Sequence, residues 1–165
     1  MNRIQQAKAR LEKAYQEVEE TDAVSEAIEI VSKYATVDGK AILDFAIDDI
    51  QADFLKLASI NMFVNSLWAE AVYQATQSTN KRRWHHSTNW SQNKQNQKGP
   101  KGAPISDKYC DAITEQSIYA YREDEAAKQR KAMLLQSAVN SVQEVINALK
   151  KVGDRLVAQG PLNNL

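Results

Sequence analysis

The sequence contains few residues that interrupt regular secondary structure or cross-link the chain. Its 165 residues include one cysteine, Cys110, together with three prolines and five glycines. A single cysteine excludes an internal disulfide framework and is typical of a protein from a reducing compartment. The scarcity of proline and glycine excludes the collagen-like and Pro/Gly-rich disordered classes and disfavours a turn-dense β fold.

Long apolar runs are also absent. The sequence has no eighteen consecutive apolar residues, so we expect no membrane-spanning helix. The first twenty residues lack the apolar core of a secretory signal. We therefore expect a cytoplasmic protein that has no membrane partner.

Carboxylates are missing from one long stretch. The formal net charge is zero, but residues 1–70 hold seven basic and thirteen acidic residues. Residues 71–106 hold six basic residues and no acidic one, and residues 107–165 hold eight of each. The local field is therefore more informative than the total charge. The acid-free stretch indicates either a polyanionic partner or a solvated polar loop that contains few acids.

Apolar residues recur at spacings of three and four, which predicts an all-α fold of about four helices, two of them long. We expect one helical domain over 1–165. Its parts are acidic N-terminal helices in 1–39, a long helix over 40–77, a basic polar loop over 78–105 and a long C-terminal helix over 106–158. Ser106 is expected to cap the last helix, because its hydroxyl can accept a bond from a free backbone N–H.

The C-terminal helix contains a heptad seam. Its apolar positions alternate at spacings of three and four: Leu135, Ala138, Val142, Val145, Leu149, Val152 and Leu156. This pattern is typical of helices that pack in coiled coils. It predicts either an interface between copies of the chain or packing against the long helix over 40–77. We expect the first, a homo-oligomer.

Large rings stand beside cations in the predicted loop. Trp84 and Trp90 have no apolar neighbours in sequence, and phosphates attract cations while rings stack on unpaired bases. The candidate nucleic-acid contacts are Lys81, Arg82, Arg83, Trp84, His85, Trp90, Lys94, Lys98 and Lys101. No base-reading motif is present, so binding should tolerate any sequence. In the alternative interpretation both Trp rings fold back onto the helices, and the cations stabilise a helix C-terminus.

No constellation typical of catalysis or metal binding occurs. There is no Gly-rich phosphate loop and no HExxH motif, and the adjacent His85 and His86 would point apart. The carboxylates at Asp44, Asp48, Asp49 and Asp53 suit magnesium, although such a group is more often a solvated stripe. Cys110 has no base nearby in sequence, so a half-buried structural thiol is expected. We predict no enzyme activity, no cofactor and no metal.

The layout resembles that of the phage UvsY-type recombination mediators. Lys81, Arg82, Arg83 and Trp84 form a basic and aromatic cluster, a polar loop follows, and "ISDKYCDAI" then opens a helix that continues into "LLQSAVNSVQEVINALKKVGDRL". The resemblance covers about 50–156. It implies a ring-like homo-oligomer whose final helix packs subunits together. It also implies that Lys81 and Arg83 contact DNA, and that the protein acts in the cytoplasm of a phage-infected bacterial cell.

The predicted function is that of a single-stranded DNA-binding recombination mediator. Such a protein helps to load a RecA-like recombinase onto strands covered by a single-stranded-DNA-binding protein, so both are expected partners. One alternative is a small helical inhibitor of a nucleic-acid enzyme, or a protein that sequesters a phosphate ligand. Another is a helical scaffold protein.

Overall fold

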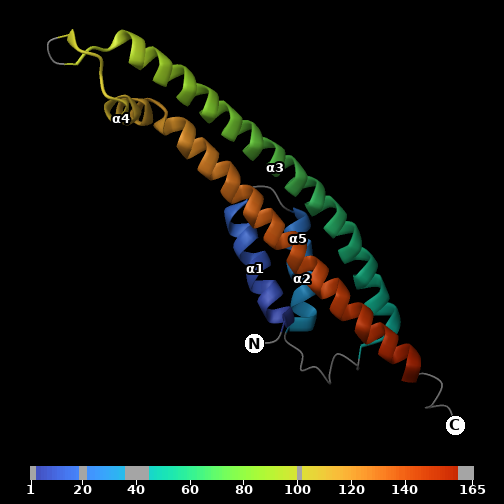
Figure 1. The fold of residues 1–165 in the computed structure, drawn as a ribbon. Helices are drawn as coiled ribbons and strands as arrows, with labels where there is room; N and C mark the ends of the chain where they lie inside the picture. The colour runs from blue at the N-terminus through green and yellow to red at the C-terminus, as the bar shows by residue number, and fades with distance from the viewer. Residues whose placement is uncertain (1–2, 19–21, 36–44, 100–101, 160–165) are drawn as a thin grey trace. The chain divides into compact units, whose positions relative to one another are not determined.

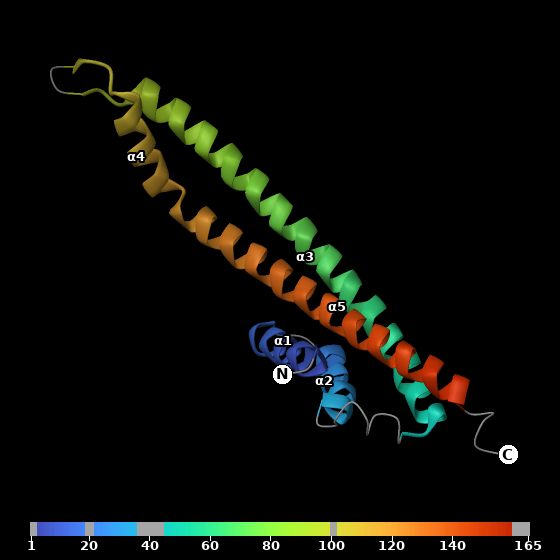
Figure 2. The same ribbon diagram turned by 60° about the horizontal axis from the view of Figure 1, so that its bottom comes forward.

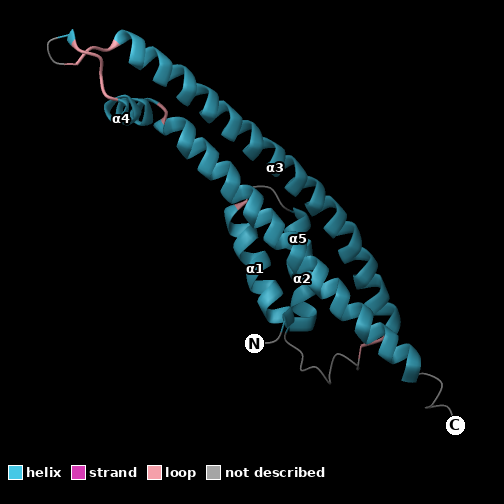
Figure 3. Ribbon diagram, viewed as in Figure 1, coloured by secondary structure: helices cyan, strands magenta, loops and turns pink. Residues whose placement is uncertain are grey.

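The computed structural model is all-α and describes residues 3–18, 22–35, 45–99 and 102–159. Within these ranges it has five helices and no strand (Figures 1 and 3): α1 (Arg3–Glu17), α2 (Asp22–Ala35), α3 (Ile47–Asn96), α4 (Asp107–Ser117) and α5 (Tyr119–Gln159). The predicted fold class is confirmed, with five helices in place of about four. None of the helices in these ranges combines the length and hydropathy that crossing a bilayer requires.

Contacts divide the chain into two compact units. Unit 1 consists of Met1–Ala69 and Met133–Leu165, and unit 2 consists of Glu70–Ala132. Both α3 and α5 therefore contribute residues to each unit. The prediction of one domain stays a prediction.

Unit 1 is a cluster of four helical segments: α1, α2, the start of α3 and the end of α5. Its buried apolar residues recur at helical spacing, so each segment has an apolar face; the largest are Leu11, Val24, Val31, Tyr34, Ile50, Leu57, Val64, Leu135, Val142, Val145 and Leu149. The Tyr34 hydroxyl donates to Asp53 of α3 at 2.8 Å. Burial, and then this bond to a carboxylate, raise the pKa of Tyr34 above its ordinary value.

The heptad seam of α5 lies mostly inside unit 1. Leu135, Ala138, Val142, Val145 and Leu149 are at most 1% exposed, whereas Val152 and Leu156 are partly exposed. The side-chain amide of Asn61 on α3 donates a hydrogen bond of 3.0 Å to the side-chain oxygen of Gln143 on α5. The two helices therefore lie side by side here. Packing within the chain is the alternative that the pattern had left open. The five buried positions offer no surface to a second copy.

In unit 2 most of the predicted loop over 78–105 is helix, which corrects the prediction. The helix expected over 40–77 begins, in the described part, at Ile47 and continues to Asn96, so 78–96 is helix. Residues 36–44, where the predicted start falls, lie outside the described residues. The polar residues of 78–96 disfavour a helix by less than about 0.7 kcal/mol each, and neither Pro nor Gly interrupts them. Hydrogen bonds and ion pairs with α4 and α5 can therefore outweigh this small cost and keep the segment helical.

The connection after α3 reverses the chain, and α4 and the start of α5 return beside the second half of α3 (Figures 1 and 2). Gly102 has a φ of +77°, a left-handed conformation that favours glycine. The N–H of Gly99 donates to the carbonyl of Ala103 at 2.7 Å. The Ser106 hydroxyl accepts a bond from the N–H of Tyr109, which confirms the predicted cap.

The C-terminal helix is not continuous, in contrast to the prediction for 106–158. It breaks at Ile118, which separates α4 from α5 and has a φ of −104° and a ψ of 7°. The N–H of Ile118 still bonds to the carbonyl of Thr114, and its side chain is fully buried. Burial of this apolar side chain stabilises a break that no Pro or Gly marks in the sequence.

Candidate nucleic-acid interface

A ladder of polar contacts joins α3 to α4 within unit 2. Lys94 pairs with Asp107 at 2.5 Å, and the Trp90 indole donates to Asp111 at 2.8 Å. One turn further along each helix, His86 lies 3.5 Å from Glu115. Each step of four residues back along α3 matches a step of four forward along α4. This is the register of an antiparallel helix pair, because residues four apart lie on one face.

The start of α5 extends these contacts with two more carboxylates. Arg82 forms an ion pair with Glu125, which also accepts a bond from Thr79 at 2.7 Å. The bonds from Thr79 and then Arg82 hold the pKa of Glu125 below its usual range. Asp124 accepts bonds from Lys128 at 2.8 Å and from Ser78, and these lower its pKa in the same way.

These contacts give the acid-free stretch a structural reason. The carboxylates that face it are supplied by α4 and α5, so acids on α3 itself would repel them across the pair. Four of the nine candidate residues have partners or packing of this kind: Arg82, Trp90, Lys94 and His85, whose ring stacks on Tyr121 at 3.9 Å between centroids. The prediction that Arg82 and Lys94 are available to a nucleic acid is corrected accordingly, because both are paired with carboxylates of the same chain.

Lys81 and Trp84 remain open to solvent. The Trp84 side chain is 62% exposed, and its ring meets His85 edge-on at 4.7 Å between centroids. The Lys81 ammonium lies 5.4 Å from the centroid of the Tyr121 ring. A ring beside an ammonium group can stack on a base while the cation attracts the adjoining phosphate.

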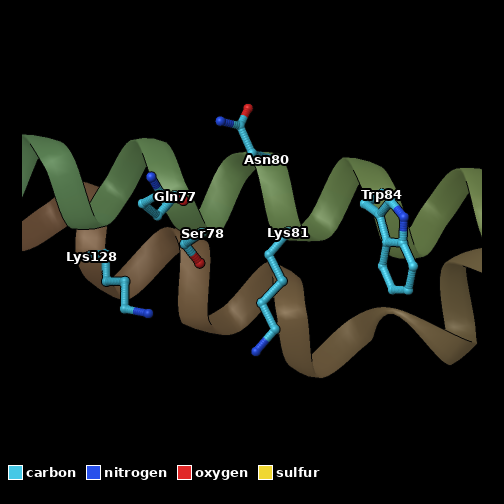
Figure 4. A pocket seen from close by; sticks show the side chains of 6 residues that line it. All are labelled: Gln77, Ser78, Asn80, Lys81, Trp84 and Lys128. Atoms are coloured by element: carbon cyan, nitrogen blue, oxygen red, sulfur yellow. The ribbon is translucent and has the colours of Figure 1, made fainter.

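A shallow groove of about 460 Å³ lies at this place, which we call the Trp84 groove. Its lining comes from one stretch of α3 and from Lys128 of α5 (Figure 4): Gln77, Ser78, Asn80, Lys81, Trp84 and Lys128. Lys81 and Trp84 project to the same side of α3 in this view, whereas Asn80 points away. The groove thus combines a stacking surface with two ammonium groups, although Lys128 also contacts Asp124.

The other predicted contacts are more scattered. Arg83 is exposed on α3, and Lys98 is exposed in the connection after it. Lys101 lies outside the described residues. The structure therefore brings Lys81 and Trp84 together, and it does not place Lys94 or Lys98 in the groove that they line.

Sequence reasoning missed Lys128 and Tyr121, because both come from the returning helix. A signal for the pairing was present in the sequence. Asp107, Asp111 and Glu115 recur every four residues, as do three of their partners on α3 in the reverse direction. Of those three partners only Lys94 is a Lys or Arg, so this pattern predicts the pairing of the two helices and the neutralisation of Lys94.

Asp53 and Cys110, a carboxylate and a thiol that the sequence had offered as candidates, both make contacts within the fold. Among the described residues no three His, Cys, Asp or Glu side chains are grouped as metal ligands, and Asp44 lies outside them. Asp53 bonds to Lys33 and Tyr34. Cys110 is fully buried, and its Sγ lies 3.3 Å from the carbonyl oxygen of Trp90. A buried thiol in such a contact is structural.

No family model matches the chain, and neither a curated protein nor a solved structure matches it.

Proposed function

We propose that this protein binds single-stranded DNA through the Trp84 groove. The observation that supports the proposal is the 62% exposed ring of Trp84, one helical turn from the ammonium of Lys81. Stacking of a base on an aromatic ring contributes about 1–3 kcal/mol, and the ammonium attracts the adjoining phosphate. Bases in a duplex stack on each other, so the groove favours an unpaired strand.

The proposal includes a role as a recombination mediator, which rests on the resemblance to the UvsY-type proteins. A mediator of this kind presents many weak sites to one strand, and multivalency raises the total affinity. A recombinase and a single-stranded-DNA-binding protein are then the partners. Self-association needs a surface other than the buried seam. The exposed apolar side chains of Leu55, Met62 and Phe63 on α3 are candidates for it.

Equilibrium binding to a fluorescent oligothymidine tests the DNA proposal. Trp84→Leu removes the ring but keeps an apolar side chain, and we expect binding to weaken about 5- to 100-fold. Tyr73→Leu is the matched control, because Tyr73 is a 60% exposed ring on the same helix and does not line the groove. Equal affinities of the two variants and the wild type would refute binding at the Trp84 groove.

The main alternative is a helical scaffold protein. The contacts of α3 with α4 and α5 favour it, because the chain itself neutralises two of the six cations that suggested a polyanion, Arg82 and Lys94. The same titration separates the two functions. A scaffold would show no saturable binding of the oligothymidine, and Trp84→Leu would change nothing.

A further inference from the structure

Unit 1 contains a second groove, of about 500 Å³, between α1 and the end of α5. Four cationic side chains line it: Arg3 and Arg10 from α1, and Lys151 and Arg155 from α5. We call it the α1–α5 groove. It lies outside the region that the charge pattern of the sequence had singled out.

The positive charge of this groove is only partly compensated. Among the described residues that line it the one carboxylate, Glu144, pairs with Arg10 at 2.5 Å, and Arg10 also donates to Ser141 at 2.9 Å. Among the described residues, no salt bridge involves Arg3, Lys151 or Arg155. The groove therefore contains the Arg10 guanidinium, which is held by Glu144 and Ser141, and three cations that form no salt bridge with a described residue.

Helix electrostatics do not explain this arrangement. Lys151 and Arg155 precede the last turn of α5, which contains no basic residue, so the free carbonyls at that helix end contribute little to their placement. Arg3 is the first residue of α1, the end at which the helix dipole disfavours a cation. A bound anion would relieve the repulsion among the cations. The positive end of the α1 dipole would also stabilise it.

The lining also indicates the chemistry of the anion. Arg forks match phosphate oxygens in a bidentate manner, and the amides of Gln6 and Asn147 can donate further bonds. None of the described residues that line the groove is aromatic, so they offer no surface on which a base could stack. The groove should therefore recognise phosphate groups and be indifferent to bases.

We propose that the α1–α5 groove binds the phosphate groups of a polyphosphate or of a nucleic-acid backbone. The proposal does not depend on the function proposed for the Trp84 groove. Both sources present closely spaced phosphates on a flexible chain, and they share the same recognition chemistry.

Calorimetric titration of the full-length protein with sodium tripolyphosphate tests the proposal. Lys151→Gln combined with Arg155→Gln should weaken binding about tenfold or more, because two charge-assisted contacts are lost. Lys13→Gln combined with Lys150→Gln is the matched control. Both lysines are exposed on the same two helices and lie outside the lining, so the net charge falls equally.

The control should bind tripolyphosphate like the wild type. Equal weakening in both double variants would mean that only net charge matters, and this would overturn the proposal. Circular dichroism checks that the variants are folded, and Arg3→Gln provides an independent test on α1. Absence of tripolyphosphate binding in the folded wild type at low salt would also overturn it.

Competition identifies the source of the phosphates. If oligothymidine displaces tripolyphosphate from Trp84→Leu, the groove binds a backbone; if it does not, the ligand is a free polyphosphate. Either result supports a phosphate site. Tighter binding of polyglutamate than of tripolyphosphate would overturn it in favour of an acidic protein. Because Trp84→Leu should bind tripolyphosphate normally, failure of one groove is distinguishable from failure of the other.

Discussion

Units 1 and 2 bury different kinds of side chain. Unit 1 holds most of the buried apolar residues, including Leu11, Tyr34 and Leu57. Over the described part of unit 2, the buried apolar residues are fewer and mostly small: Ala71, Ala75, Ile105, Cys110, Ile118 and Ala132. Its helices are joined instead by ion pairs and hydrogen bonds between α3 and the helices that return beside it.

The difference teaches how a charge run should be interpreted. In unit 1 the apolar period specifies the packing, because area removed from water is its main source of stability. In unit 2 the basic and polar side chains of α3 face carboxylates of α4 and α5. These contacts specify which helix faces meet. A stretch without carboxylates can therefore complement another part of the same chain as well as an external polyanion.

The two grooves repeat the contrast at the surface. The Trp84 groove joins a ring to ammonium groups, whereas the described lining of the α1–α5 groove has four cations, two amides and no ring. We propose unpaired bases as the ligand of the first and phosphates of any origin as the ligand of the second. Four experiments test these differences between the two units and between the two grooves.

The largest effect should come from a charge in the core of unit 1. Val145→Asp places a carboxylate at a fully buried position, and we expect a loss of at least about 3 kcal/mol of unfolding free energy. Urea denaturation followed by circular dichroism measures it. Val157→Asp is the control, because Val157 is 60% exposed on the same helix. A folded Val145→Asp protein that changes only its oligomeric state in light scattering would restore the seam as an interface.

A smaller loss is expected from the polar contacts of unit 2. Glu125→Gln removes the charge that bonds to Arg82 and Thr79, at a cost of about 1–2 kcal/mol. Adding Arg82→Gln should recover part of the loss, because no unpaired charge then remains. The coupling in this double-mutant cycle, measured by urea denaturation, tests the polar cohesion of unit 2. Additive losses would show that the pair contributes no stability of its own.

The salt dependence of DNA binding separates free cations from paired ones. Lys81→Gln should flatten the log–log slope of affinity against salt by about 0.7, the value for one phosphate contact on a single strand. Lys94→Gln should leave the slope unchanged, because Lys94 is engaged by Asp107 and by the carbonyl of Ile105. An equal change in both variants would mean that the pairing in unit 2 does not select the DNA contacts.

The smallest effect concerns acid pH. Contacts with Lys128 and Ser78 lower the pKa of Asp124, as those with Thr79 and Arg82 lower that of Glu125. Such carboxylates stabilise the fold above their unfolded pKa of about 4 and lose this contribution as the pH falls through the lower folded values. Melting temperatures should therefore fall across this range, and less steeply for Asp124→Asn. An identical profile for that variant would contradict the assignment.

Much of the fold could be predicted from local patterns. Apolar spacing identified the helices that became α1 and α2, and the hydroxyl of Ser106 identified the start of α4. These signals act within a few residues, so the sequence displays them directly. Lys81 and Trp84 were predicted as site residues for the same kind of reason, since a ring among charges has nothing local to pack against.

Local residue patterns specify the helical class, the apolar faces and the segregation of charge along the chain. The helix over 78–96, the burial of five of the seven seam positions and the choice of cations that stay open depend on tertiary contacts. The reason is that the helix propensities of Asn, Gln, Ser and Thr differ by only fractions of a kcal/mol. Contacts between residues twenty or more positions apart, such as those of Trp90 with Asp111 and of Arg82 with Glu125, outweigh such differences. Those contacts exist only once the chain has reversed.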